Sequence, residues 1–290
     1  MAKIAIALDS NSGVTQKEAE KLGLYVLPMP FMIEDKVYYE ERDLSHDEFY
    51  ERMEAGERIT TSQPTPKDVT GFWNELLKTH DEVVYIPMSS GLSGSCQTAR
   101  LLAQDYEGKV EVVNNQRISV TQKQSALDGA YLAAEKGMNA AQIKEFLEED
   151  KFNSSIYIML DTLTYLKKGG RITPAAAALG NILRLKPVLQ IQGEKLDAFA
   201  KARTVSQGKS IMLNAVKNDI AERFGGNPDN VIISVVHSHN LDGAELFREE
   251  LKKEFPEHEM EIQDLPLSIG CHLGPGALAI TCVQKICRVS

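Results

Sequence analysis

The chain has 290 residues, of which 43% are hydrophobic and 25% charged, and it carries a formal net charge of -9. This length allows one large domain or two moderate ones, and we favour two. The negative charge works against general binding to nucleic acid or to anionic membrane surfaces. No apolar run approaches the roughly 18 residues of a membrane-spanning helix, and no secretion signal is visible. We therefore expect a cytoplasmic protein without stable membrane insertion.

Strand-like apolar runs alternate with helix-periodic segments in the first half of the chain. We expect strands at residues 4–8, 83–87 and 110–113, followed by helices at residues 17–22, 96–104 and 124–136. Such alternation is typical of βαβ units and predicts a largely parallel sheet flanked by helices. Helix starts are predicted at Thr15, Ser45 and Thr65, because each has an acidic residue three positions later.

The pattern changes beyond about residue 150, so we place one domain at 1–150 and a second at 151–290. The second domain opens with an expected strand at 155–160 and a break at Gly169-Gly170. An alanine-rich helix, a hairpin from Lys186 to Ala200, a helix at 206–223, a strand at 231–236, a helix at 244–255 and a closing strand pair follow. Both domains therefore belong to the α/β class.

The segment Pro87–Ser95 carries the densest polar signal. It offers four serine hydroxyls and two glycines where a buried strand hands over to a helix, which is where ligands bind in open α/β sheets. A helix N-terminus presents unpaired N–H groups, glycine allows close approach, and hydroxyls donate to anions. An ordinary helix cap is the alternative, but four hydroxyls exceed what one cap requires. The loop is therefore predicted to hold an anionic group.

The same loop also suggests a serine hydrolase. Gly91-Leu-Ser93-Gly-Ser95 approaches the G-x-S-x-G nucleophile motif, and His272 lies downstream as an esterase order requires. Ser95 stands where the motif has glycine, however, and no HGGG-type oxyanion segment is present. A serine esterase or acyltransferase that uses Ser93 and His272 remains the alternative function.

Four further regions carry side chains suited to an anion. The loop 60–66 places Thr61 and Ser62 beside prolines that stiffen the backbone. Arg171 follows a glycine turn and Arg203 precedes a long helix, and a guanidinium can bind a carboxylate or phosphate with two bonds. His272 stands beside a Gly-Pro-Gly turn, where it can donate to an anion or act as a base. Each also has a plain structural alternative, such as a surface arginine or a turn histidine.

The sequence contains little evidence for a metal site or a nucleotide site. His237 and His239 lack a Cys or carboxylate cluster in metal-ligand spacing. Gly208-Lys209-Ser210 resembles the end of a P-loop, but Arg203 stands where the first glycine is needed. We therefore expect no metal and no cofactor.

Taken together, these motifs resemble those of the DegV family. The matching segments are Asp9-Ser10, Thr61-Ser-Gln-Pro64, Ser89-Ser-Gly-Leu-Ser-Gly94, Leu166-Lys-Lys-Gly-Gly-Arg171, Lys186-Pro187, Lys201-Ala-Arg203-Thr204 and His272-x-Gly-Pro-Gly-Ala277. The resemblance implies a two-domain fold with a largely parallel N-terminal sheet, a mixed C-terminal sheet and a ligand cleft between the domains. It also implies a carrier rather than a catalyst, which binds one long-chain fatty acid, such as palmitate, stearate or oleate, with the tail in an apolar tunnel.

The resemblance further implies a partner. Bacterial family members in fatty-acid uptake present the acid to a separate ATP-dependent fatty acid kinase, and the acyl-phosphate formed serves phospholipid synthesis. By motif, the carboxylate would be held by Thr61, Ser62, Ser93, the Gly94 amide and His272, while Arg171 and Arg203 would support that site or face the kinase. One departure is visible at 113–117, where Val-Asn-Asn-Gln-Arg replaces the acidic turn of many relatives.

Overall fold

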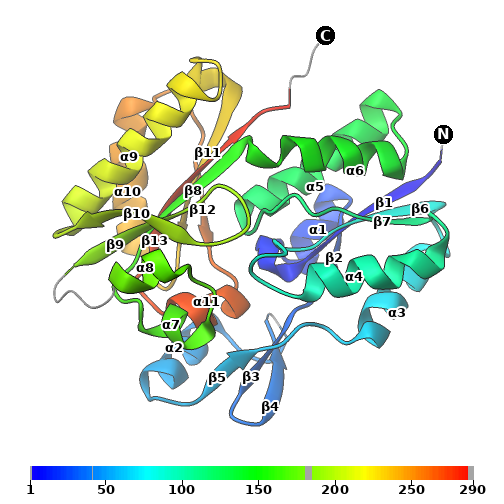
Figure 1. Cartoon of the computed structure of the whole chain (residues 1–290), viewed down its shortest axis with the longest axis horizontal. Coiled ribbons are helices and arrows are strands. Elements are labelled where there is room, and N and C mark those ends of the chain that lie inside the picture. The colour runs from blue at the N-terminus through cyan, green and yellow to red at the C-terminus, as the bar shows by residue number, and fades with distance from the viewer. Residues whose placement is uncertain (1, 41, 180–184, 287–290) are drawn as a thin grey trace. The chain divides into compact units, whose positions relative to one another are not determined.

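The computed structural model describes residues 2–40, 42–179 and 185–286 (Figure 1). The chain divides into two compact units. Unit 1 comprises Met1–Leu44 and Thr60–Lys151, and unit 2 comprises Ser45–Ile59 and Phe152–Ser290. The segment Ser45–Ile59, which a single boundary near residue 150 assigns to the first domain, therefore clusters with the second unit.

Unit 1 is built on a four-stranded parallel sheet with the order β2-β1-β6-β7. Its strands are β1 (Ile4–Asp9), β2 (Tyr25–Leu27), β6 (Glu82–Ile86) and β7 (Val110–Val112), and its helices are α1 (Gln16–Leu22), α3 (Pro66–Leu76), α4 (Ser95–Ala103), α5 (Val120–Lys136) and α6 (Ala140–Glu149). A smaller three-stranded sheet has the order β4-β3-β5, formed by β3 (Pro30–Ile33), β4 (Lys36–Tyr39) and β5 (Ile59–Thr61). The predicted parallel N-terminal sheet is confirmed.

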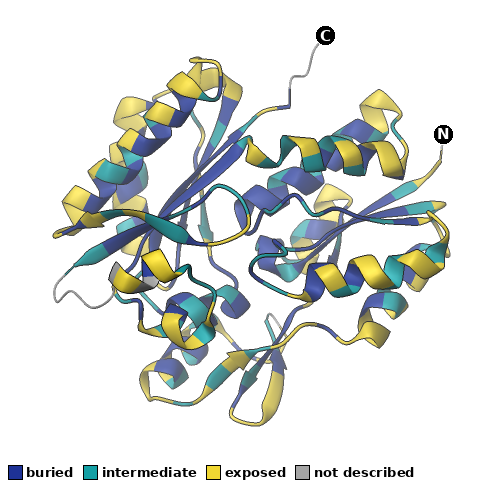
Figure 2. Ribbon diagram, in the orientation of Figure 1, coloured by how far each residue is buried: buried dark blue, intermediate teal, exposed yellow. Residues whose placement is uncertain are grey.

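Alternating side chains of β1 explain why helices cover both faces of this sheet. Ala5 and Ala7 belong to one buried cluster with Trp73 of α3 and Ala99 of α4. Ile6, between them in sequence, lies on the α5 side, 3.7 Å from the position of a Cβ on Gly129. A strand that is apolar on both faces is typical of a parallel sheet between two helical layers. Figure 2 shows the resulting buried strands beneath helices with exposed outer faces.

The predicted helix starts are confirmed. Thr15 accepts a hydrogen bond from the Glu18 N–H at 3.1 Å, and Ser45 accepts one from the Glu48 N–H at 3.3 Å. Thr65 forms a full capping box with Asp68, with proline at the first helical position. Each cap satisfies a backbone donor that would otherwise be unpaired at the helix start.

Unit 2 is built on a six-stranded mixed sheet with the order β10-β9-β8-β13-β11-β12. Its strands are β8 (Ser154–Met159), β9 (Lys186–Ile191), β10 (Asp197–Ala202), β11 (Val231–His237), β12 (Glu261–Asp264) and β13 (Leu278–Gln284), and its helices are α2 (His46–Glu54), α7 (Thr164–Gly169), α8 (Pro174–Leu179), α9 (Val205–Glu222), α10 (Leu241–Glu254) and α11 (Leu267–Leu273). Only the β11–β12 pair is parallel among the pairings of this sheet in the described residues. The mixed sheet and the β9–β10 hairpin are as predicted.

The main core of unit 2 lies between its sheet and the helices α9 and α10. Met212 and Val216 of α9 and Phe247 and Leu251 of α10 pack with Ile233 of β11 in one buried cluster. These helices lie side by side over the sheet in Figure 1. The described residues also form four short 3-10 helices: Ser10–Ser12, Gln104–Tyr106, Asp150–Phe152 and Pro228–Asn230. None of the described helices is both long enough and apolar enough to cross a membrane.

Candidate functional site

The loop between β6 and α4 folds as a tight turn around Ser89. The Ser89 carbonyl accepts from the N–H groups of Leu92 (3.0 Å) and Ser93 (3.2 Å). The Ser89 hydroxyl accepts from the Gly91 N–H at 3.3 Å. These bonds use the donors at the start of the turn and direct the chain into α4.

The donors that remain lie where α4 begins. Ser93 Oγ accepts from the Ser95 N–H at 3.2 Å, so the Ser93 hydroxyl proton is left for another acceptor. Gly94 is the N-cap of α4 without a side-chain cap, and its N–H makes no hydrogen bond in the described part of the chain. Ser95 Oγ is buried without a partner, in a residue that is 5% exposed. A helix start with free donors and a positive partial charge is suited to an anion.

The second hydroxyl-rich loop lies next to this helix start. Gln63 Oε1 accepts from Thr98 Oγ1 of α4 at 3.3 Å and lies 3.5 Å from the position of a Cβ on Gly94. Thr61 ends β5 and is half-buried, whereas Ser62 is exposed. The structure thus brings the two predicted loops together within unit 1. The amide of Gln63, which is not among the predicted site residues, is an additional polar group beside Gly94.

Asp9, at the carboxyl end of β1, serves the protein rather than a ligand. It is 0% exposed, and its oxygens accept from the Met88 N–H at 2.8 Å, from Asn11 and from Gln122 Nε2 at 3.1 Å. Burial raises the pKa of this carboxyl, and the hydrogen bonds oppose that rise. Asp9 therefore braces the end of β6 from within the core.

His272 of α11 is partly buried in unit 2, beside Gly169 and Arg171. A Cβ placed on Gly169 would lie 2.3 Å from His272 Nδ1, so only glycine allows this approach. Arg171 Nη1 donates to the Gly169 carbonyl. Burial, with a smaller contribution from the Arg171 charge, lowers the pKa of His272 to about 4. At neutral pH the imidazole is therefore uncharged and carries one N–H donor.

The glycines after His272 are required by packing. Gly274 has φ 74, and a Cβ there would lie 2.3 Å from the ring of Tyr165. A Cβ on Gly276, with φ 85, would lie 2.9 Å from Asp161 Oδ2. Left-handed φ values and such close neighbours both favour glycine. The turn beside His272 is therefore shaped by segment 161–171, which also contains Arg171.

Arg203, the last of the predicted site residues, precedes α9 in unit 2. Arg203 is exposed, and its backbone N–H donates to Gln207 Oε1 at 2.8 Å. Its guanidinium makes no ion pair in the described part of the chain. Ser93 belongs to unit 1 and His272 to unit 2. Among the described residues, no group of three or more His, Cys, Asp or Glu side chains could hold a metal ion.

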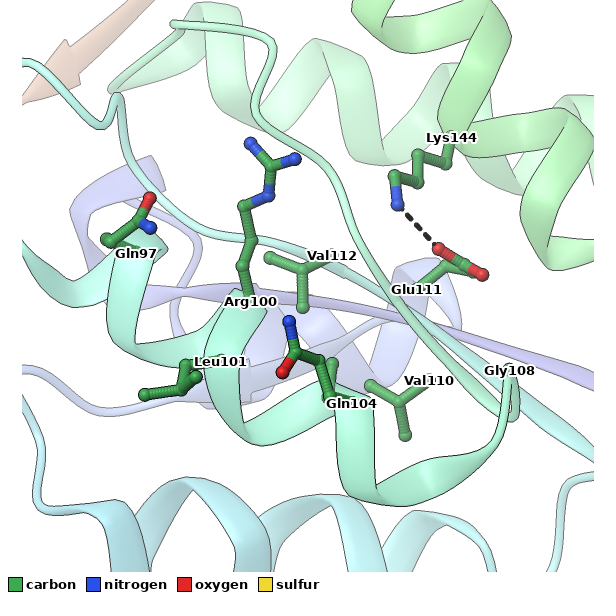
Figure 3. Close-up of a pocket in the computed structure, with 10 residues that line it drawn as sticks. Gln97, Arg100, Leu101, Gln104, Gly108, Val110, Glu111, Val112 and Lys144 are labelled. Carbon is green, nitrogen blue, oxygen red and sulfur yellow. Dashed lines mark hydrogen bonds and ion pairs between the residues drawn. The ribbon is translucent and has the colours of Figure 1, made fainter.

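A groove of about 500 Å³ runs along β7 in unit 1 (Figure 3). Its polar lining includes Gln97 and Arg100 of α4 and Gln104 of the 3-10 helix that follows. Lys144 Nζ forms an ion pair of 2.7 Å with Glu111 Oε2. It contains none of the predicted site residues. Such a polar lining is unsuited to an alkyl chain.

A family model described as "Uncharacterised protein, DegV family" matches residues 3–285. A DegV domain-containing protein of Listeria innocua is 31% identical over 286 residues, which cover 96% of this chain and 98% of the relative. A DegV domain-containing protein from Halalkalibacterium halodurans is 30% identical over 284 residues, which cover 97% of this chain and 98% of the relative.

Two solved structures share this fold. A fatty-acid-binding DegV family protein from Thermus thermophilus superposes with a TM-score of 0.88 at 28% identity, over 97% of this chain and 99% of that one. DegV of Bacillus subtilis, a fatty acid binding protein, superposes with a TM-score of 0.86 at 29% identity, over 98% of this chain and 100% of that one. The sequence matches and the shared fold agree, and the chain belongs to the DegV family.

Proposed function

We propose that this protein is a cytoplasmic, non-catalytic carrier that binds one long-chain fatty acid, such as palmitate, stearate or oleate. The observation that carries the proposal is the start of α4, where the Gly94 N–H and the Ser93 hydroxyl proton have no acceptor in the described residues. The relatives from Thermus thermophilus and Bacillus subtilis, which bind fatty acids, support the same ligand class.

The head group is assigned to neutral donors. A buried carboxylate is costly unless it is hydrogen-bonded, and in unit 1 the donors we assign are Thr61, Ser62, Ser93 and the Gly94 amide. In unit 2 we assign the same role to His272, whose pKa of about 4 keeps the imidazole neutral and able to donate. Arg171, whose charge contributes to the lowered pKa of that imidazole, would support the site.

The tail is expected to supply most of the affinity. Each buried methylene contributes roughly 0.8 kcal/mol, so a sixteen-carbon chain contributes on the order of 10 kcal/mol before the losses of association. The donors then need only to orient the carboxylate. This division fits a carrier, because strong tail binding does not require a fixed ion pair at the head group.

We further propose that the bound acid is presented to a separate ATP-dependent fatty acid kinase. The kinase would supply nucleotide and phosphorylate the carboxylate, and the acyl-phosphate would enter phospholipid synthesis. Arg203, which is exposed and lacks an ion pair, is the residue we assign to the kinase-facing surface. Reversing its charge should then slow acyl-phosphate formation by the kinase without changing fatty-acid affinity.

Organic extraction of freshly purified protein, followed by mass spectrometry, tests the ligand directly. We expect one acyl chain per protein, and Ser93→Ala should weaken oleate binding. Ser210→Ala is the matched control, because this exposed hydroxyl only donates to the Ser206 carbonyl. No extractable acyl chain and no binding of added oleate would refute the proposal. Ester hydrolysis that is abolished by Ser93→Ala would instead establish the esterase alternative.

A further inference from the structure

Three consecutive backbone donors of the β6–α4 loop are each held by a different support. The Met88 N–H donates to Asp9 Oδ2 at 2.8 Å, the Ser89 N–H to the Arg117 carbonyl at 2.9 Å and the Ser90 N–H to Asn114 Oδ1 at 3.4 Å. Two of these supports come from the segment that follows β7. The position of the loop therefore depends on residues 114–119.

This supporting segment is itself held under strain. Gln116 has φ 60 and Ser119 has φ 56, positive values that cost a non-glycine residue of the order of 1 kcal/mol. Arg117, which is 1% exposed, holds it in place through Asp150, whose Oδ2 accepts at 2.7 Å and whose carbonyl accepts at 2.8 Å. The Ser119 N–H donates to the Asn11 carbonyl at 2.9 Å.

Asn114 and Ser90 bond reciprocally, and the direction of the second bond is fixed by the first. A backbone N–H can only donate, so the atom of Asn114 that faces the Ser90 N–H must be Oδ1. Nδ2 is then the atom that meets Ser90 Oγ, to which it donates at 2.9 Å. Ser90 Oγ is an acceptor in this bond, and its own proton has no acceptor in the described residues.

We infer that Ser90 is a further carboxylate donor and that Asn114 is the residue that positions it. The inference rests on the proposed function and adds Ser90 to the donors assigned there. An aspartate at 114 would still accept from the Ser90 N–H, but it would also capture the Ser90 hydroxyl proton. Asparagine thus keeps the loop in place and leaves that proton for the ligand.

Oleate affinity of four variants tests this inference. Ser90→Ala and Asn114→Asp should each weaken oleate binding about 10-fold or more, the value of one hydrogen bond to a charged group. The double variant should bind like either single variant, because both changes remove the same proton. Asn139→Asp is the matched control, since it adds the same charge in unit 1 at the N-cap of α6, where aspartate caps as well as asparagine. Wild-type affinity in Ser90→Ala, or fully additive losses, would overturn the inference.

Hydrogen exchange of the ligand-free protein tests the positioning role without any fatty acid. Asn114→Ala should speed exchange across residues 88–95, whereas Asn114→Asp and Asn139→Ala should leave it unchanged. Unchanged exchange in Asn114→Ala would overturn the positioning role. If the wild-type protein fails to bind oleate, the proposed function and the donor role of Ser90 fail together, while the exchange result still decides whether Asn114 positions the loop.

Discussion

Substituting Gly169 by alanine should displace the His272 ring while leaving the fold intact. The new Cβ would lie 2.3 Å from His272 Nδ1, and real Cβ contacts do not fall below 3.0 Å. The ring must therefore move by at least 0.7 Å, the difference between these distances. Rotating it away from its preferred rotamer costs about 1 kcal/mol. Gly169 is the last residue of α7 and has no left-handed φ, and alanine is favoured over glycine in a helix by up to about 1 kcal/mol, so stability should change little.

Two measurements follow this displacement. The pKa of His272, about 4 in the wild type through burial, should rise toward the ordinary value of 6.5 in an NMR titration of Gly169→Ala, because the ring becomes more hydrated. Oleate affinity should fall about 10-fold, as it should for His272→Ala, through loss of one hydrogen bond to a charge. Gly71→Ala is the control, since that glycine of α3 has no atom within 4 Å of the added Cβ. A pKa that stays near 4 together with unchanged oleate affinity would refute the reasoning.

Three further predictions concern stability. Asp150→Ala leaves the buried Arg117 without its ion-pair partner and should lower the free energy of unfolding by about 3–5 kcal/mol in urea; a loss below about 1 kcal/mol would contradict the pairing. Ser95→Ala removes a buried hydroxyl that has no partner, so it should keep or raise the melting temperature of the ligand-free protein. A marked fall in the melting temperature would show that this hydroxyl does form a stabilising bond. The pKa of His272 is lowered in the folded protein, so its contribution to the free energy of unfolding is present above pH 6.5 and is lost as the pH falls toward 4. Between pH 7 and pH 5 the free energy of unfolding should fall by about 2 kcal/mol more in the wild type than in His272→Gln. An equal fall in the two proteins would contradict this direction.

Structural features that depend only on residues close together in sequence could be predicted. The caps at Thr15, Ser45 and Thr65 need only the residue itself and a partner three positions later, and all three form. The loop Ser89–Ser95 could be placed at a helix start because apolar periodicity fixes where a strand ends and a helix begins. The predicted roles of its hydroxyls remain predictions, since no ligand is bound.

Features set by side chains far apart in sequence could not be predicted. Asn114 meets Ser90 across 24 positions because β7 lies next to β6, and a single sequence does not reveal which strands are neighbours. Gly169 and His272 are brought together by the packing of α7 and α11, although each motif was recognised separately. The grouping of Ser45–Ile59 with unit 2 also depends on contacts between residues far apart in sequence. The amino-acid composition of a segment does not reveal such contacts.

The charge states of His272 and of the donors at the start of α4 affect how a carrier could release its fatty acid. His272 is neutral at physiological pH, and the donors at the start of α4 are hydroxyls and a backbone amide. Hydrogen bonds from neutral groups stabilise a carboxylate less than a buried ion pair does. In the proposed site, neutral donors would therefore orient the head group without fixing it, and they would leave the carboxylate ionised and able to react. In the proposed carrier, the tail holds the acid, while the head group remains available to a second protein.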